Sequence, residues 1–385
     1  MTAVPDLHTC FKTLIASPSI SSLDPSQDQA NDQLIQHLHH WLTDLGFRCE
    51  VKQVISSRGK QNLLASIVPP DSRGGLLLSG HTDTVPFDQQ RWNSDPFTLT
   101  EKDGRWYGLG SCDMKGFFAL IIAALQELPL TELKRPLYIL ATADEETTMN
   151  GAKAFAAERK IQPDYAIIGE PTGLRPVYMH KGHLAKGIRI TGRSGHSSDP
   201  ELGLNAIEII NLAISQLLKL REHLKQGYQE SVFSVPYPTL NLGHIHGGDA
   251  ANRICGCCEL HLDLRPIPGI PLPDLEVLLR QYLMPITDQY PDSLEIFNLY
   301  PGSEAFKGDA SSDWSQQVAA LSGQQPEVVN YATEAPYLQQ LGCQTLVLGP
   351  GHIAQAHQPD EYLEMQYLQP TVRLIKELIY NACLI

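Results

Sequence analysis

The stretch Leu76-Leu77-Leu78-Ser79-Gly80-His81-Thr82-Asp83-Thr84-Val85-Pro86 is the starting point for interpreting this chain. Its first residues form a short apolar run that ends at a glycine, a pattern typical of a buried strand in a parallel sheet. Ligands in open α/β sheets bind beyond the carboxyl ends of such strands. His81 and Asp83 follow the strand directly, so we expect them at a binding site, although a turn that carries polar residues would give the same pattern.

The same pattern recurs later in the chain. Three further apolar runs are predicted to be strands: residues 137–143, 164–169 and 345–348. Each leads into residues that can bind a metal ion: Glu145 and Glu146, Glu170, and His357 in a longer loop. A solvated acidic turn is the alternative for Asp144-Glu145-Glu146, because buried like charges repel. Asp113 precedes a predicted buried helix over residues 117–128, where it could instead cap the helix.

The order of these elements predicts two domains. With 385 residues, the chain is longer than one hydrophobic core usually fills. Helix-like stretches such as 28–45 alternate with strand-like ones, which indicates an α/β catalytic domain with a mixed, largely parallel sheet and helices on both faces. We expect this metal-binding domain to comprise residues 1–182 and 300–385.

The strands between these two segments have a different pattern. Apolar and polar residues alternate over residues 184–192, 239–245 and 254–265, and the element order is β-α-β-β-α-β. This order predicts an antiparallel sheet with helices on one face. Residues 183–299 are therefore expected to form an inserted α+β, ferredoxin-like domain.

Composition excludes several classes of function. The net charge of -14 argues against nucleic acid and anionic membranes as partners. No apolar run approaches the ~20 residues of a transmembrane helix, and residues 1–10 do not resemble a signal peptide. The eight cysteines are scattered along the chain, so free thiols in a reducing cytoplasm are expected. A soft-metal site is the alternative for Cys255, Cys257 and Cys258.

The residues at the strand ends are chemically suited to metal ions. Two imidazoles and several carboxylates at one sheet edge are ligands for zinc or a related divalent ion. They exceed what one tetrahedral ion with an open position can use. Two ions about 3.5–4 Å apart, bridged by one carboxylate, would use all of them.

Four segments together resemble a known family. They are residues 81–86, Gly110-Ser111-Cys112-Asp113-Met114-Lys115-Gly116, residues 144–146 and Gly169-Glu170-Pro171. They are similar to the motifs of the dinuclear zinc M20 peptidase and amidohydrolase family, which includes aminoacylases, carboxypeptidases and desuccinylases. Three more stretches, 91–97, 247–255 and 333–336, resemble the members that deacetylate N2-acetyl-L-ornithine to L-ornithine and acetate in arginine biosynthesis. The dinuclear zinc centre and the deacetylation of N2-acetyl-L-ornithine are therefore what the resemblance implies for this chain.

The resemblance also implies residue roles. It assigns five ligands to two Zn²⁺ ions, with Co²⁺ as an alternative metal: His81 and Glu170 for the first ion, Glu146 and His357 for the second, and Asp113 bridging both. Asp83 would accept a hydrogen bond from the other ring nitrogen of His81. Glu145 would be the general base that takes a proton from the attacking water and passes it to the leaving amine.

The inserted domain is implied to be a lid that closes on a small-molecule substrate and forms a homodimer. His196 would reach the partner subunit's site and stabilise the oxyanion, and a loop histidine that caps the next helix is the alternative. Asn252 and Arg253 would bind the substrate, with a surface salt bridge as the alternative for Arg253. Glu334 is a candidate for binding the ornithine amine.

Two other functions remain open at this point. One is a related enzyme, such as a succinyl-diaminopimelate desuccinylase or a broad aminoacylase. The other is a binding protein that has the fold without catalysis. The complete ligand set together with Glu145 argues against the second, because a relative without catalysis is expected to lack at least one of these residues.

Overall fold

The computed structural model describes residues 4–55 and 57–385. The expectation that residues 1–10 are not a signal peptide falls partly on residues 1–3, which lie outside the described residues. The chain separates into two compact units. Unit 1 comprises Met1–Tyr178, Gly308–Glu327 and Thr333–Ile385, and unit 2 comprises Met179–Lys307 and Val328–Ala332. Within the described ranges, no helix is both long and apolar enough to cross a membrane.

Unit 1 is built on a mixed sheet. Its strands follow the order β1 (Arg48–Gln53), β2 (Gln61–Ile67), β6 (Leu137–Thr142), β3 (Leu76–His81), β7 (Tyr165–Pro171), β15 (Gln344–Gly349) and β8 (Val177–His180). The central strands β6, β3, β7 and β15 are parallel, and β1, β2 and β8 pair antiparallel. The predicted fold class of this domain is therefore confirmed.

The register of the central strands brings their carboxyl ends to one level. Leu76 of β3 lies opposite Leu137 of β6, and His81 lies opposite Thr142. Every residue of β3 and β6 is buried, since helices cover both faces of a parallel sheet. The polar residues that follow each strand therefore emerge at the same edge.

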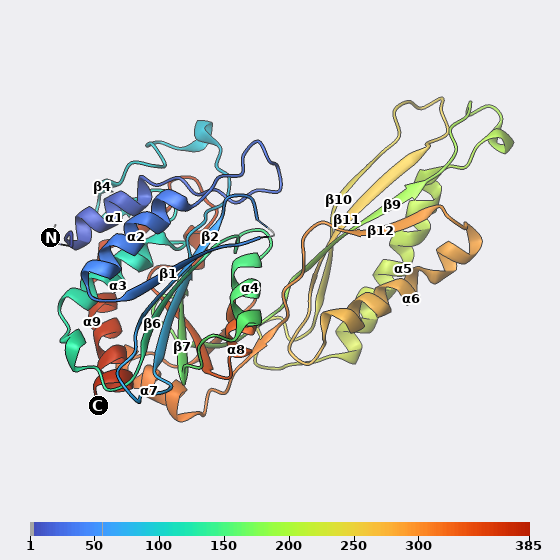
Figure 1. Cartoon of the computed structure of the whole chain (residues 1–385). Coiled ribbons are helices and arrows are strands. Elements are labelled where there is room, and N and C mark those ends of the chain that lie inside the picture. The colour runs from blue at the N-terminus through green and yellow to red at the C-terminus, as the bar shows by residue number, and fades with distance from the viewer. Residues whose placement is uncertain (1–3, 56) are drawn as a thin grey trace. The chain divides into compact units, whose positions relative to one another are not determined.

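Helices cover the sheet on both sides (Figure 1). One face carries α1 (Leu7–Ile15), α2 (Asp32–Asp44), α3 (Lys115–Gln126) and α9 (Leu368–Ile379), and the other carries α4 (Asn150–Glu158) and α8 (Ala335–Gln339). Helix α7 (Asp313–Ser322) packs near α9. A small second sheet joins β16 (Tyr362–Glu364), β5 (Arg105–Tyr107) and β4 (Thr100–Lys102).

Two predicted helices differ from the observed ones at their first residues. Helix α2 begins at Asp32 instead of residue 28. The residue before it, Asn31, forms side-chain hydrogen bonds to two segments that lie further along the chain. Its Nδ2 donates to the Gln61 carbonyl and to Thr82 Oγ1, both at 2.8 Å. Helix α3 begins at Lys115, and its N-cap Met114 provides no side-chain bond, so Asp113 does not cap it.

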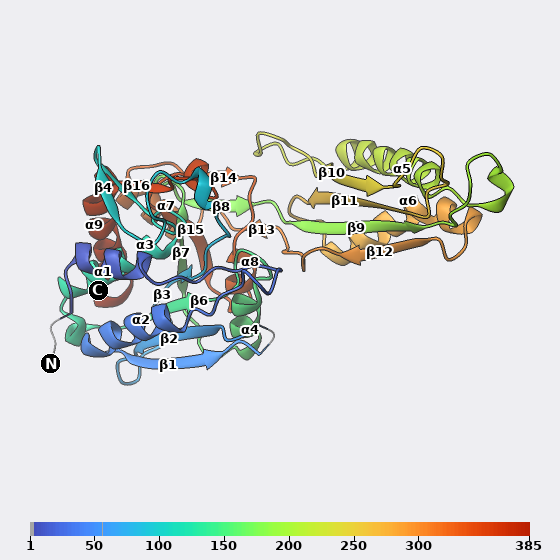
Figure 2. The same cartoon turned by 90° about the horizontal axis from the view of Figure 1, so that it is seen from above.

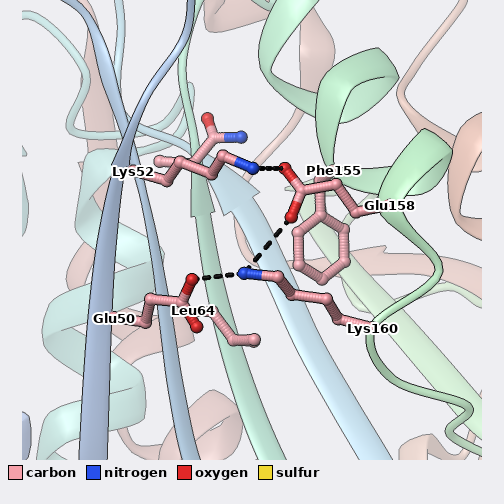
Figure 3. Close-up of a pocket in the computed structure, with 7 residues that line it drawn as sticks. Glu50, Lys52, Leu64, Phe155, Glu158 and Lys160 are labelled. Atoms are coloured by element: carbon pink, nitrogen blue, oxygen red, sulfur yellow. Dashed lines mark hydrogen bonds and ion pairs between the residues drawn. The ribbon is translucent and has the colours of Figure 1, made fainter.

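Ion pairs fasten the end of α4 to the edge strand β1 (Figure 3). Lys52 pairs with Glu158, and Lys160 pairs with Glu50 and, at 3.3 Å, with Glu158. Such exposed pairs contribute only about 0–1 kcal/mol each. They hold the end of α4 against the sheet, and α4 directly follows the segment that contains Glu145 and Glu146.

Unit 2 has the predicted β-α-β-β-α-β order (Figure 2). Its elements are β9 (Leu184–Thr191), α5 (Ala206–Gly227), β10 (Thr239–Gly247), β11 (Cys257–Arg265), α6 (Leu272–Gln289) and β12 (Leu294–Asn298). The strands are antiparallel in the order β10-β11-β9-β12. Alternate residues of β11 are buried and α5 packs on this sheet, which confirms the antiparallel sheet with helical cover.

The cysteines of unit 2 lie outside the group of close metal-ligating side chains found among the described residues. All eight cysteines are free thiols. In the described part of the chain, one group of His, Cys, Asp and Glu side chains has ligand atoms close enough to share an ion, and it lies in unit 1. The alternative of a soft-metal site at Cys255, Cys257 and Cys258 is therefore not supported.

Candidate metal centre

Five predicted ligands meet at the carboxyl edge of the unit 1 sheet. His81 is the last residue of β3, and Glu170 lies near the end of β7. The other three come from connecting segments: Asp113 before α3, Glu146 after β6, and His357 in the loop between β15 and β16. Ligand atoms of His81, Asp113 and Glu146 all lie within 4.8 Å of one another.

Asp113 lies between the two histidines. Its Oδ1 is 3.0 Å from His81 Nε2, and its Oδ2 is 3.7 Å from His357 Nε2. The two oxygens of one carboxylate thus face two different imidazoles. This is the arrangement that a carboxylate needs to bridge two ions.

Each histidine has a second carboxylate beside it. His81 Nε2 lies 3.6 Å from Glu170 Oε1. His357 Nε2 lies 2.9 Å from Glu146 Oε2. The five residues therefore divide into two imidazole–carboxylate pairs with Asp113 between them, which fits two divalent ions better than one.

The electrostatics of these groups also fit cations. Burial and the nearby Asp113 carboxylate raise the pKa of Glu170 well above its usual range, and the same two causes raise the pKa of Glu146. A hydrogen bond to Glu146 raises the pKa of His357 to about 9. Carboxylates crowded in this way repel unless protons or cations lie among them. Divalent ions would supply that charge and leave both imidazoles neutral, as ligation requires.

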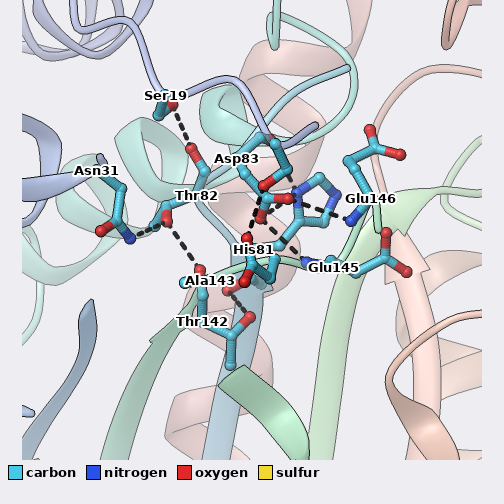
Figure 4. A network of polar contacts seen from close by, with 12 residues as sticks. Ser19, Asn31, His81, Thr82, Asp83, Thr142, Ala143, Glu145 and Glu146 are labelled. Atoms are coloured by element: carbon cyan, nitrogen blue, oxygen red, sulfur yellow. Dashed lines mark hydrogen bonds and ion pairs between the residues drawn. The ribbon is translucent and has the colours of Figure 1, made fainter. Parts of the chain in front are cut away.

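Asp83 lies beside the other ring nitrogen of His81, with its backbone carbonyl closer to that nitrogen than its carboxylate (Figure 4). The Nδ1 atom of His81 lies 3.0 Å from the backbone carbonyl of Asp83, while the carboxylate Oδ1 is 3.7 Å away. The carboxylate instead accepts backbone hydrogen bonds from Glu145 at 3.2 Å and Glu146 at 3.1 Å. The carbonyl orients the ring of His81, and the carboxylate orients the two glutamates.

The turn after β6 sends adjacent glutamates to different environments. Asp144 has a φ of 62°, in the left-handed region that aspartate tolerates better than most residues. Its carbonyl accepts from the backbone N–H groups of Thr148 and Met149, at 3.0 and 2.6 Å. Glu146 contacts His357, whereas Glu145 has no part in the ligand pairs described above. Burial raises the pKa of Glu145 well above its usual range, with His81 opposing and neighbouring carboxylates adding to the rise.

Sequence reasoning missed Glu361. This buried carboxylate accepts backbone hydrogen bonds from Gly110, Cys112 and Asp113 at 3.0, 2.8 and 2.9 Å. It thereby ties the turn that carries Asp113 to the segment that follows His357. In the sequence, Glu361 is distinguished only by its position four residues after His357, and acidic residues at such spacings are too common to predict a structural role. Burial and the Asp113 charge raise its pKa to about 7.

Glu334 lies in unit 1 and is fully buried. Thr142 Oγ1 donates to its Oε2 at 2.9 Å, and burial raises its pKa to about 7. Among the described residues its Oε1 has no hydrogen-bond partner. Contact with a substrate amine stays a prediction, because the side chain is covered in this structure.

The predicted lid residues form one cluster in unit 2. His196 and Arg253 share an antiparallel bridge, and the Asn252 carbonyl accepts from Ser197 N at 3.1 Å. Asn205 caps α5 through its own side chain, so His196 does not have the capping role that was its alternative. Arg253 forms the surface ion pair that was its alternative, with Asp249 at 2.6 Å. Substrate contacts by His196, Asn252 and Arg253 stay predictions.

Comparison with known proteins agrees with this geometry. A family model described as Peptidase family M20/M25/M40 matches residues 77–381. The chain is 55% identical over 382 residues to the acetylornithine deacetylase of Edwardsiella ictaluri (strain 93-146), and the match covers 99% of each protein.

Two solved structures have the same fold. One is the M20 family metallo-carboxypeptidase Sso-CP2 from Sulfolobus solfataricus, with 19% identity, a TM-score of 0.78 and coverage of 97% of this chain and 98% of that one. The other is the YXEP protein of Bacillus subtilis, a dinuclear metal binding peptidase, with 16% identity, a TM-score of 0.65 and coverage of 97% and 96%. At these identities the likeness concerns the fold alone.

Proposed function

The chain belongs to peptidase family M20/M25/M40, and from this premise we propose that it is a metal-dependent amide hydrolase that converts N2-acetyl-L-ornithine to L-ornithine and acetate in arginine biosynthesis. The observation that supports this substrate most strongly is the 55% identity to an acetylornithine deacetylase over nearly the whole of both proteins. The chemistry is supported by the position of Asp113 between His81 and His357.

We propose that the centre holds two Zn²⁺ ions, with Co²⁺ as an alternative metal. His81 and Glu170 would bind one ion, Glu146 and His357 the other, and Asp113 both. When bound, such ions would supply Lewis-acid chemistry, lowering the pKa of a bound water toward neutrality and polarising the substrate carbonyl. The mixed imidazole and carboxylate donors suit zinc, and the crowding of their negative charge favours divalent cations.

Glu145 is the proposed general base. Its carboxylate would accept a proton from the attacking water and deliver it to the nitrogen of the leaving amine. Burial raises the pKa of Glu145, so this carboxylate binds a proton more readily than an exposed glutamate does, which supports a role in proton transfer. The Asp83 carboxylate would hold the backbone of Glu145 in position throughout.

The residues of unit 2 complete the proposal. We propose a homodimer formed through the inserted unit, which would act as a lid over the substrate. His196 would donate to the oxyanion in the partner subunit's site, and Arg253 would bind the substrate carboxylate through two parallel hydrogen bonds, with Asn252 beside it. The free cysteines support a cytoplasmic location.

A substrate panel tests the proposed function. Protein loaded with a known number of zinc ions is assayed with N2-acetyl-L-ornithine, succinyl-diaminopimelate and several N-acetylated neutral amino acids. We expect kcat/KM for acetylornithine to exceed the others by at least ~10-fold, the effect of about 1.4 kcal/mol. Faster hydrolysis of the succinyl substrate would identify a desuccinylase, equal rates would identify a broad aminoacylase, and no hydrolysis at all would indicate a binding protein.

The dimer proposal has its own test. His196→Ala is expected to lower kcat about 10²–10³-fold, as loss of an oxyanion donor does, without changing sedimentation. Mixing it with a Glu145→Gln protein should restore part of the activity if each site uses a histidine from the other subunit. Failure of the mixture to gain activity, with dimers present, would count against sharing between subunits.

A further inference from the structure

A buried lysine lies behind the glutamate turn. Lys60 directly precedes β2 and is 1% exposed. Its Nζ lies 2.7 Å from Asp144 Oδ1 and 2.8 Å from Asp28 Oδ1. An ammonium group is costly to bury unless charged partners compensate it, so these two carboxylates are what allow Lys60 to occupy this position.

A serine closes this arrangement. Lys60 Nζ donates to Ser21 Oγ at 2.6 Å, and Ser21 Oγ donates to Asp144 Oδ1 at 3.0 Å. One oxygen of Asp144 therefore receives hydrogen bonds from both Lys60 and Ser21. Although burial lowers the pKa of Lys60, its hydrogen bonds to Asp144 and Asp28 raise it above the usual value, so the lysine stays charged.

Asp144 connects this cluster to the metal centre. It occupies the left-handed conformation at the start of the turn, and the next two residues are Glu145 and Glu146. On the far side of the turn, the Asp83 carboxylate accepts the N–H groups of those two residues. The turn is thus held at its side chain by Lys60 and at its backbone by Asp83.

We propose that Lys60 is a positioning residue for Glu145 and Glu146, and that it acts by holding the Asp144 carboxylate. The roles of the two glutamates rest on the proposed function. Among the described residues no hydrogen bond or ion pair joins Lys60 to either glutamate, whereas Asp144 bonds to Lys60 and directly precedes them, so the proposed influence passes through Asp144. Asp28 also pairs with Lys60 and accepts from the backbone N–H of Ser22, but among the described residues no hydrogen bond or ion pair joins it directly to residues 144–146, so it serves as a control within the same cluster.

The first test compares Asp144→Asn with Asp28→Asn. Each variant removes one negative charge from Lys60. We expect Asp144→Asn to lower kcat by about 10–100-fold and weaken zinc binding by a similar factor, as loss of a group that orients a ligand does. Asp28→Asn should change both quantities by less than ~3-fold, the usual limit for a site that is not coupled. Equal losses in the two variants would overturn the proposal.

The second test is a double-mutant cycle. If Lys60 acts through Asp144, the loss of kcat in Lys60→Met combined with Asp144→Asn should equal the larger single loss and not their product. A multiplicative loss would mean that Lys60 acts by another route and would overturn the proposal. Lys60→Arg, which keeps the charge, should recover part of the activity. If Lys60→Met does not fold, the uncharged but polar Lys60→Gln replaces it in the cycle.

A readout without substrate separates this inference from the proposed function. Each variant is loaded with Co²⁺, and its visible absorption spectrum and cobalt affinity are compared with the unmodified protein. We expect both to change in Lys60→Met and Asp144→Asn but not in Asp28→Asn. An unchanged spectrum and affinity in Asp144→Asn would overturn the positioning role. An unmodified protein that binds cobalt but hydrolyses no N-acyl amino acid would instead contradict the proposed function.

Discussion

The backbone N–H of Glu146 donates a hydrogen bond to the Asp83 carboxylate at 3.1 Å. The same carboxylate accepts from the N–H of Glu145, so it holds the backbone of a proposed metal ligand and of the proposed general base together. His81 is oriented instead by the Asp83 carbonyl. One residue thus organises both halves of the site through two different groups, and only its carboxylate can be altered by substitution.

Asp83→Asn is therefore expected to disturb the glutamates more than His81. The amide keeps one acceptor oxygen, but its NH₂ group would face a backbone N–H and lose that hydrogen bond. We expect zinc affinity to fall by about 10–100-fold, as for other groups that orient metal ligands. Zinc titration measures the affinity, and ¹⁵N NMR of the histidine ring reports its tautomer. A changed His81 tautomer with unchanged zinc affinity would contradict this division of roles.

Glu145→Gln and Asp113→Asn should separate proton transfer from metal binding. Glu145→Gln keeps the shape of the side chain but cannot accept a proton, so kcat should fall by about 10²–10⁴-fold while bound zinc stays near the unmodified level. Asp113→Asn should lose zinc, because Asp113 faces both histidines. Elemental analysis of the purified variants decides the matter, and equal metal loss in both would show that the roles are wrongly assigned.

Glu361→Gln tests the buried carboxylate behind Asp113. A glutamine offers one acceptor oxygen to three N–H donors and turns an NH₂ group toward at least one of them. The unpaired donor should cost about 1–3 kcal/mol of unfolding free energy, measured by urea denaturation. Glu364→Gln is the control, since its carboxylate pairs with the exposed Gln366 side chain. If the two variants were equally stable, Glu361 would not hold the Asp113 turn.

The buried His180 is expected to lower the unfolding free energy of the protein at acidic pH. This histidine is fully buried in β8, and burial lowers its pKa from 6.5 to about 4. Between these values the unfolded chain binds a proton at His180 that the folded chain does not, so the contribution of His180 to the unfolding free energy is complete above pH 6.5 and falls as the pH drops toward 4.

The contribution lost at His180 is about 3.5 kcal/mol, from ~1.4 kcal/mol for each unit of pKa. Urea unfolding of metal-free protein at several pH values between 4 and 7 measures it. His180→Gln should be less stable at neutral pH but should show a weaker dependence on pH over this range. An equally steep dependence in the variant would assign the effect to other groups.

Much of the fold could be predicted because local patterns and tertiary structure agree. The apolar runs that became β3 and β6 are buried on both faces, and the alternating run that became β11 is buried on one. Helix starts were less predictable. Residues 28–31 have a helical pattern, yet Asp28 pairs with Lys60 and Asn31 bonds to Gln61 and Thr82, and these partners lie far along the chain.

The sequence by itself determined which side chains stand at the ends of the parallel strands, and therefore that His81, Glu146 and Glu170 meet at one edge. That follows from chain geometry, since a strand places the residue after it at the edge of the sheet. Only the tertiary structure decided which buried groups hold those side chains: Lys60 behind Asp144, Glu361 behind Asp113, and the carboxylate of Asp83 on the glutamate backbone. The physical reason is that a hydrogen bond depends on the direction and separation of two groups, and neither is set until segments more than 60 residues apart have packed together.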